Sequence, residues 1–549
     1  MIKEKLFLGI SLGFNSSACL YSNVRGLLKC VSQERFNRIK NTKEIPIDAI
    51  KFCIEGLSEI EDVCISHYEH ITTQYFEKYL PNYDYKGETW EDYLRNMIND
   101  LGTSFKDIFR IPHHKAHQYS GFGFHPIEDE YYLVSSDGFG DGYSAQIYEE
   151  FKSGINIIDY YVSGRNLGQS IGLMYQFVTG ALGFKEHEHE GKITGLAAHG
   201  KPIYLDNLCS LYDTSDESNI KYIGEITAED KIQSKDSPII DFDVFLSLKR
   251  NVYAIVTDLL ESGAEPKDIA SSVQEFAEKF TLKWLEKCCT TKKAVYLSGG
   301  LFANVKLNQR IKDSGLFTQV YVCPAMGDEG TCVGACIYHL GKPKIDGKFM
   351  NVFGGVTPLS LNQDNLNEDD LIDKMIDMIA SNKVVCYVSD KMEFGPRALC
   401  HRTIFCDATD PSINDRLNKR LGRTEFMPFA PVCAEEFAND LFKNFNGGEI
   451  TSKFMTITFD GTDEFCNTYK GVCHIDGTAR PQCVNKHEMP FTHKLLMKYY
   501  EKTGKKCLIN TSYNLHGEPI IDSTENAIKS FNKGKLDMLV INNSIYKEV

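Results

Sequence analysis

Short runs of apolar residues recur along the chain, separated by glycine-rich turns or by amphipathic stretches with helical spacing. The first run covers residues 6–12, and a turn at residues 13–17 and a second apolar run at residues 18–22 follow it. Apolar runs of this length, bounded by turn residues, are typical of buried strands. Because such strands alternate with helical segments, the pattern predicts an α/β chain.

The strand–turn–strand pattern returns further along the chain. A strand predicted at residues 131–135 leads into the turn at residues 137–142 (DGFGDG) and a strand at residues 144–148, and Ser-Ala follows the turn in both copies. Two unrelated hairpins would also give this pattern. A duplicated unit, however, is typical of an actin-like, sugar-kinase-like nucleotide-binding fold, whose turns direct backbone N–H groups toward phosphate. Gly138 is therefore a candidate nucleotide-binding residue.

Two later strands also run into glycine-rich turns. The strand predicted at residues 294–297 precedes Gly299-Gly300 and a helix that carries Asn304, and the strand predicted at residues 319–322 precedes a similar turn. Unpaired amides and the helix dipole make such turns favourable for anions. The sequence therefore indicates nucleotide contacts in this region.

The composition changes at residues 341–355, where Lys-Pro-Lys, Asp-Gly-Lys and Gly-Gly indicate a linker. We expect a first domain at residues 1–355 and a second at residues 356–549. A helix near residues 369–380 and a strand at residues 384–388 are expected to open the second domain.

The segment at residues 113–117 (HHKAH) is the sharpest candidate for metal binding. In a helix, His113 and His117 lie four residues apart on one face, where both imidazoles can reach one ion. A pair with this spacing is also often a solvated surface feature. Asp137 and Asp328, at the mouths of two glycine-rich turns, are candidate oxygen ligands. Two imidazoles and two carboxylates suit iron(II), manganese or zinc.

Charged residues beside glycine and proline indicate an anionic substrate. Glu190 and Lys192 are candidate cleft residues, and the second predicted domain places Arg397, Arg423 and Arg480 in loops shaped by glycine, proline and aromatic residues. Any single arginine could be a solvated surface charge. Because the planar guanidinium suits phosphate and carboxylate, three of them in such loops predict a small anion.

Composition excludes several classes of protein. The 60 basic and 75 acidic residues give a formal net charge of −15, so general binding of nucleic acid is not expected. No apolar run approaches the roughly 18 residues that a membrane-spanning helix needs, and the start of the chain is typical of a strand rather than a signal peptide. The 18 cysteines are scattered through apolar runs, which favours reduced buried thiols over a disulfide framework. We expect a cytoplasmic protein with no membrane partner.

A series of short motifs runs through nearly the whole chain. They are Gly9-Ile10-Ser11, Glu34-Arg35-Phe36 with Lys40, HHKAH at 113–117, Asp137-Gly138, EGKITGLA at 190–197, Ser298-Gly299-Gly300, Gly327-Asp328, EFGPRAL at 393–399, PFAP at 428–431, DGTARPQ at 476–482 and NTSYN at 510–514. In this order they resemble the carbamoyltransferase family of the NodU and CmcH proteins and of the enzymes that O-carbamoylate antibiotics. The whole set in this order is specific for the family, whereas no single motif is specific by itself.

The resemblance implies an N-terminal domain similar to the actin-like TsaD tRNA-threonylcarbamoyl transferases, followed by an α/β domain similar to YrdC. In such enzymes the C-terminal domain joins carbamoyl phosphate and ATP into carbamoyl adenylate. The N-terminal domain, with a metal ion, then moves the carbamoyl group to an acceptor hydroxyl. We accordingly expect ATP, as Mg-ATP, carbamoyl phosphate and a small-molecule hydroxyl acceptor as partners, and one divalent metal, Fe²⁺ before Mn²⁺ or Zn²⁺.

The resemblance also implies roles for single residues. The metal ligands that it implies are His113, His117, Asp137 and Asp328. Together with the turns described above, it indicates that the residues at the nucleotide and carbamoyl phosphate are Gly138, Glu190, Lys192, Gly299, Gly300, Asn304, Arg397, Arg423, Arg480 and Asn510. The expected catalytic residues are Lys40, Asn15 and Arg480.

Two positions depart from the family pattern. Asn15-Ser16 stands where many members have His-Asp, and an amide cannot take a proton from the acceptor hydroxyl as an imidazole can. Met427 stands where an arginine commonly precedes Pro-Phe-Ala-Pro, which removes one candidate anion contact. The first departure leaves the identity of the catalytic base open.

Two other functions stay open at this point. One is a tRNA-modifying threonylcarbamoyl transferase, which the net charge of −15 and the fused second domain disfavour. The other is an actin-like nucleotide-binding scaffold without catalysis, which the arginine-containing segments disfavour. The sequence does not identify the acceptor.

Overall fold

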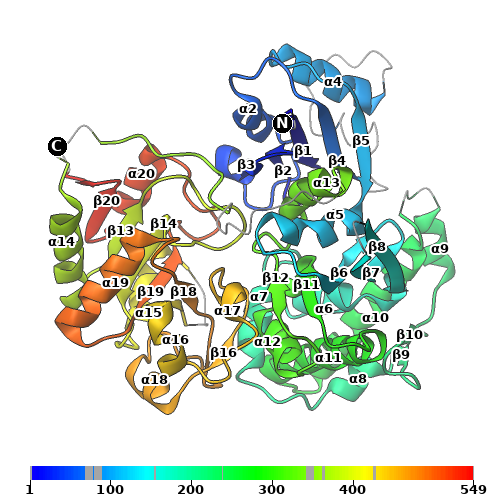
Figure 1. Ribbon diagram of the computed structural model, residues 1–549. Coiled ribbons are helices and arrows are strands. Elements are labelled where there is room, and N and C mark those ends of the chain that lie inside the picture. The colour runs from blue at the N-terminus through cyan, green and yellow to red at the C-terminus, as the bar shows by residue number, and fades with distance from the viewer. Residues whose placement is uncertain are drawn as a thin grey trace.

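A computed structural model describes residues 3–67, 78, 89–153, 156–235, 237, 239–341, 352–361, 365–423 and 428–547. Within these residues the chain forms three large sheets, each with its own covering helices (Figure 1). Most of the expected linker and Met427 lie outside the described residues. In the described part, no helix is both long and apolar enough to cross a membrane.

The first sheet has five strands in the order β3-β2-β1-β4-β5. These strands are β1 (Leu6–Ser11), β2 (Ser17–Ser22), β3 (Gly26–Ser32), β4 (Asp62–His67) and β5 (Ile108–Pro112). β1 pairs antiparallel with β2 and parallel with β4. We call this sheet and its helices α2 (Ile47–Ile54) and α4 (Trp90–Asp100) lobe 1.

The second sheet repeats this plan in the order β8-β7-β6-β11-β12. Its strands are β6 (Glu130–Gly140), β7 (Tyr143–Ser153), β8 (Asn156–Arg165), β11 (Ala294–Ser298) and β12 (Val320–Val322). β6 pairs antiparallel with β7 and parallel with β11, as β1 pairs with β2 and β4. The duplicated, actin-like unit that the sequence predicts is therefore confirmed.

Helices cover the second sheet and complete lobe 2. They are α6 (Ile171–Ala181), α7 (Glu190–Ala197), α10 (Phe242–Glu261), α11 (Pro266–Cys288) and α12 (Val305–Asp313). Phe276 and Phe280 of α11 are buried in the core of this lobe, with ring centroids 4.7 Å apart. β11 runs parallel to β6 and β12, and parallel strands need long crossover connections; α6, α7, α10 and α11 lie in the connection between β8 and β11.

The two lobes meet along a pair of helices, α5 (His113–Ser120) and α13 (Thr331–His339). Figure 1 shows this pair between the two sheets. Gly334 lets the helices approach closely, since a Cβ at this position would lie 1.7 Å from the carbonyl oxygen of Ala116. α5 follows the fifth strand of lobe 1 and α13 follows the fifth strand of lobe 2, so the two helices are equivalent parts of the duplicated unit.

The third sheet has seven strands of mixed direction in the order β18-β15-β19-β14-β13-β20-β21. Its strands are β13 (Val385–Val388), β14 (Arg402–Asp407), β15 (Ala430–Ala434), β18 (Gln482–Val484), β19 (Cys507–Ser512), β20 (Met538–Ile541) and β21 (Ser544–Ile545). Helices α14 (Glu368–Ala380) and α19 (Pro490–Thr503) cover it. The α/β class of this part is as expected, and the division at residues 355 and 356 stays a prediction.

One turn differs from its expected position. β6 continues to Gly140, so Asp137 lies within the strand rather than in a turn. The connection to β7 is the pair Asp141-Gly142, whose φ angles of 51° and 77° fit the tight turns that join antiparallel strands. A shift of register between Ser136 and Gly140 allows the strand to continue past the expected end.

Candidate metal and anion sites

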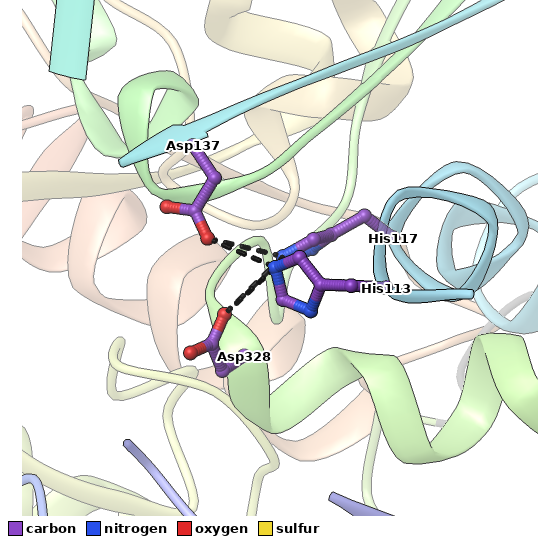
Figure 2. A group of neighbouring side chains, drawn as sticks. All are labelled: His113, His117, Asp137 and Asp328. Carbon is purple, nitrogen blue, oxygen red and sulfur yellow. Dashed lines mark hydrogen bonds and ion pairs between the residues drawn. The ribbon is translucent and has the colours of Figure 1, made fainter. Parts of the chain in front are cut away.

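Four side chains converge where lobes 1 and 2 meet, as Figure 2 shows. One ligand atom each from His113, His117, Asp137 and Asp328 lies within 4.8 Å of the other three. The two Nε2 atoms are 3.1 Å apart. Asp137 Oδ2 lies 3.3 Å from His113 Nε2, and Asp328 Oδ1 lies 3.2 Å from His117 Nε2. We call these four residues the His/Asp group, and they are the four that the sequence indicates for one metal.

Three elements position the His/Asp group. Both histidines lie on α5, Asp137 lies on β6, and Asp328 begins η4 (Asp328–Gly330), the turn between β12 and α13. Asp141 Oδ2 accepts a hydrogen bond of 2.5 Å from the backbone N–H of His113 and so satisfies one donor of the first turn of α5. Gly140 lets β6 approach the ring, since a Cβ there would lie 2.2 Å from His113 Cδ2.

Burial and neighbouring charges set the protonation of this group. Burial and the adjacent His117 lower the pKa of His113 to about 3. Burial opposes a charge on His117 as well, but the carboxylates of Asp137 and Asp328 raise its pKa to about 9. The two histidines hold the pKa of Asp137 well below its usual range against the effect of burial. At pH 7 a proton on His117 thus occupies a site that a divalent cation can take over.

The glycine-rich turn after β11 contacts the His/Asp group directly. The backbone N–H of Gly300 donates to Asp137 Oδ1 at 3.2 Å. Gly299 has a φ of 104°, and a Cβ there would lie 2.2 Å from the carbonyl oxygen of Ser136. Asn304 caps α12, because its Oδ1 accepts from the backbone N–H of Leu307 at 3.1 Å. The structure therefore gives Gly299 and Asn304 structural roles next to the predicted nucleotide site.

The other residues expected in lobe 2 lie on α6, on α7 or close to them. Gly138 packs on α6, and its carbonyl oxygen accepts from Ser170 Oγ at 2.7 Å. Glu190 begins α7, and its Oε1 accepts from the backbone N–H of His187 at 2.6 Å. Burial raises the pKa of Glu190 to about 7. Lys192 is buried on the same helix.

Lys40 and Asn15 belong to lobe 1. Lys40 is exposed, and its neighbour Asn41 donates through Nδ2 to the carbonyl oxygen of His187 at 3.2 Å, which brings this loop to the start of α7. Asn15 has a φ of 54°, and its Nδ2 lies 3.4 Å from Glu329 Oε2. The structure thus brings Asn15 beside the turn that holds Asp328, whereas Lys40 lies on the surface.

The loops that carry Arg397 and Arg480 both contact Asn510 through neighbouring residues. Asn510 is 1% exposed on β19, and its Nδ2 donates to the carbonyl oxygen of Ala398 at 3.0 Å and to Gln482 Oε1 at 2.6 Å. Ala398 follows Arg397, and Gln482 lies two residues after Arg480. We call Arg397, Arg423, Arg480 and Asn510 the arginine cluster.

Arg423 contacts the end of β19 and the residues after it. Its Nη1 donates to Thr511 Oγ1 at 3.0 Å, and its Nη2 donates to the carbonyl oxygens of Ser512 and Asn514 at 2.7 and 2.9 Å. These contacts hold the segment after β19 in place. Arg423 therefore supports the cluster, which leaves Arg397 and Arg480 as the stronger candidates for a direct anion contact.

A cavity of about 450 Å³ lies between lobe 2 and the C-terminal part. Polar residues that line it come from α7, α11, α12, β16 (Phe459–Asp460) and the following loop: Thr194, Gln274, Lys306, Asp460, His474 and Asp476. The ion pair between Lys306 Nζ and Asp476 Oδ2, at 2.9 Å, joins the two sides. Gln274 Oε1 also accepts from Asn304 Nδ2 at 2.8 Å, which connects the cavity wall with the turn after β11.

Three residues around the His/Asp group were not expected from the sequence. His114 is buried, with Nδ1 2.9 Å from Ser135 Oγ and Nε2 2.9 Å from the carbonyl oxygen of Tyr143. Asp141 accepts from the His113 amide, and Glu329, 5% exposed, faces Asn15. The only sequence signal was adjacency, since each of the three lies within four residues of a predicted ligand.

Comparisons with known proteins identify the family. Residues 6–337 match the family model for the carbamoyltransferase N-terminus, and residues 376–548 match that for the carbamoyltransferase C-terminus. The chain belongs to the carbamoyltransferase family. The resemblance seen in the sequence is confirmed, and the protein is a carbamoyltransferase.

Relatives match this carbamoyltransferase over almost its whole length. An uncharacterised protein of Methanocaldococcus jannaschii is 30% identical over 99% of this chain and 100% of its own. The nodulation protein NolNO of Sinorhizobium fredii is 27% identical over 95% of this chain and 77% of its own. Among solved structures, HypF of T. kodakarensis is 16% identical and covers 61% of this chain and 47% of its own, with a TM-score of 0.30.

Proposed function

We propose that this carbamoyltransferase uses ATP to move a carbamoyl group from carbamoyl phosphate to a hydroxyl of a small-molecule acceptor. Carbamoyl phosphate, ATP and water give carbamoyl adenylate, phosphate and pyrophosphate at the arginine cluster, and the carbamoyl group is then transferred to the acceptor hydroxyl at the His/Asp group with release of AMP. The observation that carries this proposal is the His/Asp group, whose four ligand atoms lie within 4.8 Å of one another in a chain of the carbamoyltransferase family.

The arginine cluster supplies the charge that the first half-reaction needs. Carbamoyl phosphate and the phosphates of ATP repel one another, and guanidinium groups offset that charge through paired N–H donors. Arg397 and Arg480 are assigned to this contact. Arg423 holds the segment after β19, and Asn510 ties the loops of the other two together through Ala398 and Gln482.

The His/Asp group fits one divalent cation in its donor set. Two imidazole nitrogens and two carboxylate oxygens within 4.8 Å of one another suit Fe²⁺, with Mn²⁺ and Zn²⁺ as alternatives. When bound, such an ion supplies Lewis-acid stabilisation of the charge that develops on the departing phosphate. The Gly300 amide fixes the direction of the Asp137 carboxylate, as outer partners of metal ligands do, and Asp141 anchors the backbone at the start of α5, which carries His113.

The cavity between lobe 2 and the C-terminal part is assigned as the route between the two centres, whose own residues lie outside its lining. A carbamoyl–AMP mixed anhydride is rapidly hydrolysed, so its formation and its use belong in one enclosed region from which bulk water is excluded. Lys306 and Asp476 join the two sides of the cavity by an ion pair. Gln274, which lines the cavity, also bonds to Asn304 at the turn next to Asp137.

Asn15 is assigned to bind the acceptor or a phosphate oxygen. Its amide has both donors and an acceptor, but it is not a base at neutral pH. Its side chain lies beside Glu329, which directly follows the candidate ligand Asp328 in η4. We infer that deprotonation of the acceptor hydroxyl takes place elsewhere or late, with the departing AMP phosphate taking the proton.

The test separates the two half-reactions. The wild-type protein is incubated with Mg-ATP, carbamoyl phosphate and Fe²⁺, Mn²⁺ or Zn²⁺, and adenylate, AMP and pyrophosphate are measured. Mass spectrometry of candidate hydroxyl compounds then detects the added carbamoyl group. Arg397→Ala and Arg480→Ala should block formation of the adenylate, whereas the double variant His113→Ala, His117→Ala should form it and fail to transfer.

Arg416→Ala is the matched control for the arginine variants. Arg416 lies in the same part of the chain, but its Nη2 bonds to the Oδ1 and the carbonyl oxygen of Asn382, at 2.7 and 3.1 Å, rather than to the loops around Asn510. This variant should form the adenylate at the wild-type rate. A wild-type protein that forms no adenylate would contradict the proposal. An Arg480→Ala variant that forms adenylate normally but does not transfer would reverse the assignment of the two centres.

A further inference from the structure

The motif Glu34-Arg35-Phe36 has no role in the function proposed so far. It forms the short helix α1 (Glu34–Asn37) of lobe 1. Arg35 is 3% exposed, and its Nη2 donates to the carbonyl oxygen of Gly395 at 2.8 Å, 360 residues further along the chain. The guanidinium also makes a 3.4 Å ion pair from Nη1 to Glu34 Oε1. A buried charge of lobe 1 therefore binds the backbone of the C-terminal part.

Gly395 lies in the loop that carries Arg397, and this loop also contacts lobe 2. The φ angle of Gly395 is 104°, and a Cβ there would lie 2.6 Å from the carbonyl oxygen of Pro324. Pro324 begins the segment that leads to Asp328. Glu393 closes the loop, because its Oε1 accepts from the backbone N–H of Leu399 at 2.7 Å.

The loop at residues 393–399 thus lies between three parts of the protein. Arg35 holds it from lobe 1, Pro324 bounds it in lobe 2, and Asn510 binds its Ala398 from the third sheet. The contact with Pro324 connects the loop with a segment of the His/Asp group, and the contact with Asn510 connects it with the arginine cluster.

We propose that Arg35 is a positioning residue that holds the Arg397 loop against lobe 2 and so fixes the arginine cluster relative to the His/Asp group. This inference rests on the proposed function. Arg35 does not touch the substrates; it acts through the backbone of Gly395, two residues from Arg397. The planar fork is needed because Nη2 reaches Gly395 while Nη1 reaches Glu34 and, at 3.5 Å, the carbonyl oxygen of Ile520. A lysine ammonium on a flexible stem does not reproduce these separate directions.

Arg38 provides a matched control from the same segment. It donates from Nη1 to the carbonyl oxygen of Ile520 at 2.8 Å and from Nη2 to that of Pro519 at 2.7 Å. Like Arg35, it joins lobe 1 to the C-terminal part through backbone carbonyls. Its contacts with the C-terminal part lie at residues 519–522 rather than at the Arg397 loop. A general weakening of the domain contact therefore affects both variants, whereas loss of loop position affects Arg35 variants alone.

The activity test compares Arg35→Lys and Arg38→Lys with wild type in adenylate formation. Arg35→Lys should raise KM for carbamoyl phosphate about tenfold or more, because small displacements of a positioned group cost rate and affinity steeply. Arg38→Lys should keep the wild-type KM. Gly395→Ala, which displaces the same loop from Pro324, should reproduce the Arg35→Lys effect. An unchanged KM in Arg35→Lys, or an equal rise in Arg38→Lys, would overturn the inference.

Hydrogen exchange tests the same inference without any activity. Arg35→Lys should speed exchange of the backbone amides at residues 395–399, including the Leu399 amide that bonds to Glu393. Arg38→Lys should leave these amides protected. Unchanged exchange at residues 395–399 in Arg35→Lys would contradict the inference even if activity changed. If wild type forms no adenylate, the proposed function fails, and the exchange result still decides whether Arg35 holds the loop.

Discussion

The two lobes share one strand order but differ in what their first hairpins contribute. In lobe 1, β1 and β2 pair up to Ser11 and Ser17, and Asn15 lies in the short connection between them. In lobe 2, β6 continues past the last regular pairing, Ser136 with Ala145, and carries Asp137 into the His/Asp group. The same backbone plan therefore presents a neutral amide in one copy and an ionised carboxylate in the other.

The equivalent helices differ in the same way. α5 of lobe 1 carries His113 and His117, whereas the turn before α13 of lobe 2 carries Asp328. Three of the four equivalent positions thus supply ligand atoms, and the fourth, Asn15, faces Glu329. Duplication thus brings four equivalent positions together where the lobes meet. The side chain at each position then decides whether it is assigned to metal ligation or to substrate contact.

The largest effect is expected from removing the ligand of the lobe 2 hairpin. Asp137→Asn keeps the shape of the side chain but removes the charge that attracts a cation. Metal affinity should fall at least about 100-fold, since even outer partners of metal ligands contribute up to that factor. Metal content after dialysis, measured by mass spectrometry, checks this. Full metal content in Asp137→Asn would show that the lobe 2 hairpin, like that of lobe 1, supplies no required metal ligand.

A pair of variants tests how closely β6 must approach α5. Gly140→Ala would place a Cβ 2.2 Å from the His113 ring, whereas Gly138→Ala would place one 3.6 Å from Leu173 Cδ2, an ordinary contact. We expect Gly140→Ala to weaken metal binding about 10- to 100-fold and Gly138→Ala to leave it unchanged. Isothermal titration with Mn²⁺ or Zn²⁺ measures both. Equal affinities would show that the approach of the strand does not position the ligand.

Asn15→Ala tests the hairpin of lobe 1. Loss of one hydrogen bond to a charged ligand should lower transfer by about 1.5–3 kcal/mol, roughly 10- to 150-fold, without moving the pH optimum. Metal content should stay at the wild-type value, in contrast to Asp137→Asn. Transfer rates measured against pH check both points. A moved pH profile with complete loss of activity would instead give Asn15 a part in proton transfer.

The smallest effect concerns Glu190, at the start of α7 in lobe 2. Burial raises its pKa to about 7, above the ordinary value of 4.5, so the folded protein favours the protonated form. The contribution of the protonated Glu190 side chain to the free energy of unfolding is fully present below pH 4.5 and is lost as the pH rises through about 7. Glu190→Gln should therefore melt about 1–3 °C above wild type at pH 8 and at the same temperature near pH 4.5. Parallel melting curves across this range would contradict the assignment.

Much of the site could be predicted because its signals are local. The spacing of His113 and His117 places them on one helical face in any helix, and the glycine-rich segments around Gly138 and Gly299 require turns or close approaches wherever they lie. The arginines gave a weaker signal. Arg423 resembles Arg397 and Arg480 in its sequence surroundings, yet its guanidinium binds the segment after β19, because that segment returns from far along the chain.

The sequence by itself determined the α/β pattern, the duplication and the family, because each depends on the order of short segments. Only the tertiary structure decided which residues meet. Asp137 reaches the histidines because β6 runs beyond its expected end, and Asp328 does so because α13 packs on α5. Arg35 meets Gly395 across 360 residues. Contacts of this kind depend on how whole elements pack, and packing is set by the summed burial of both lobes rather than by any local pattern.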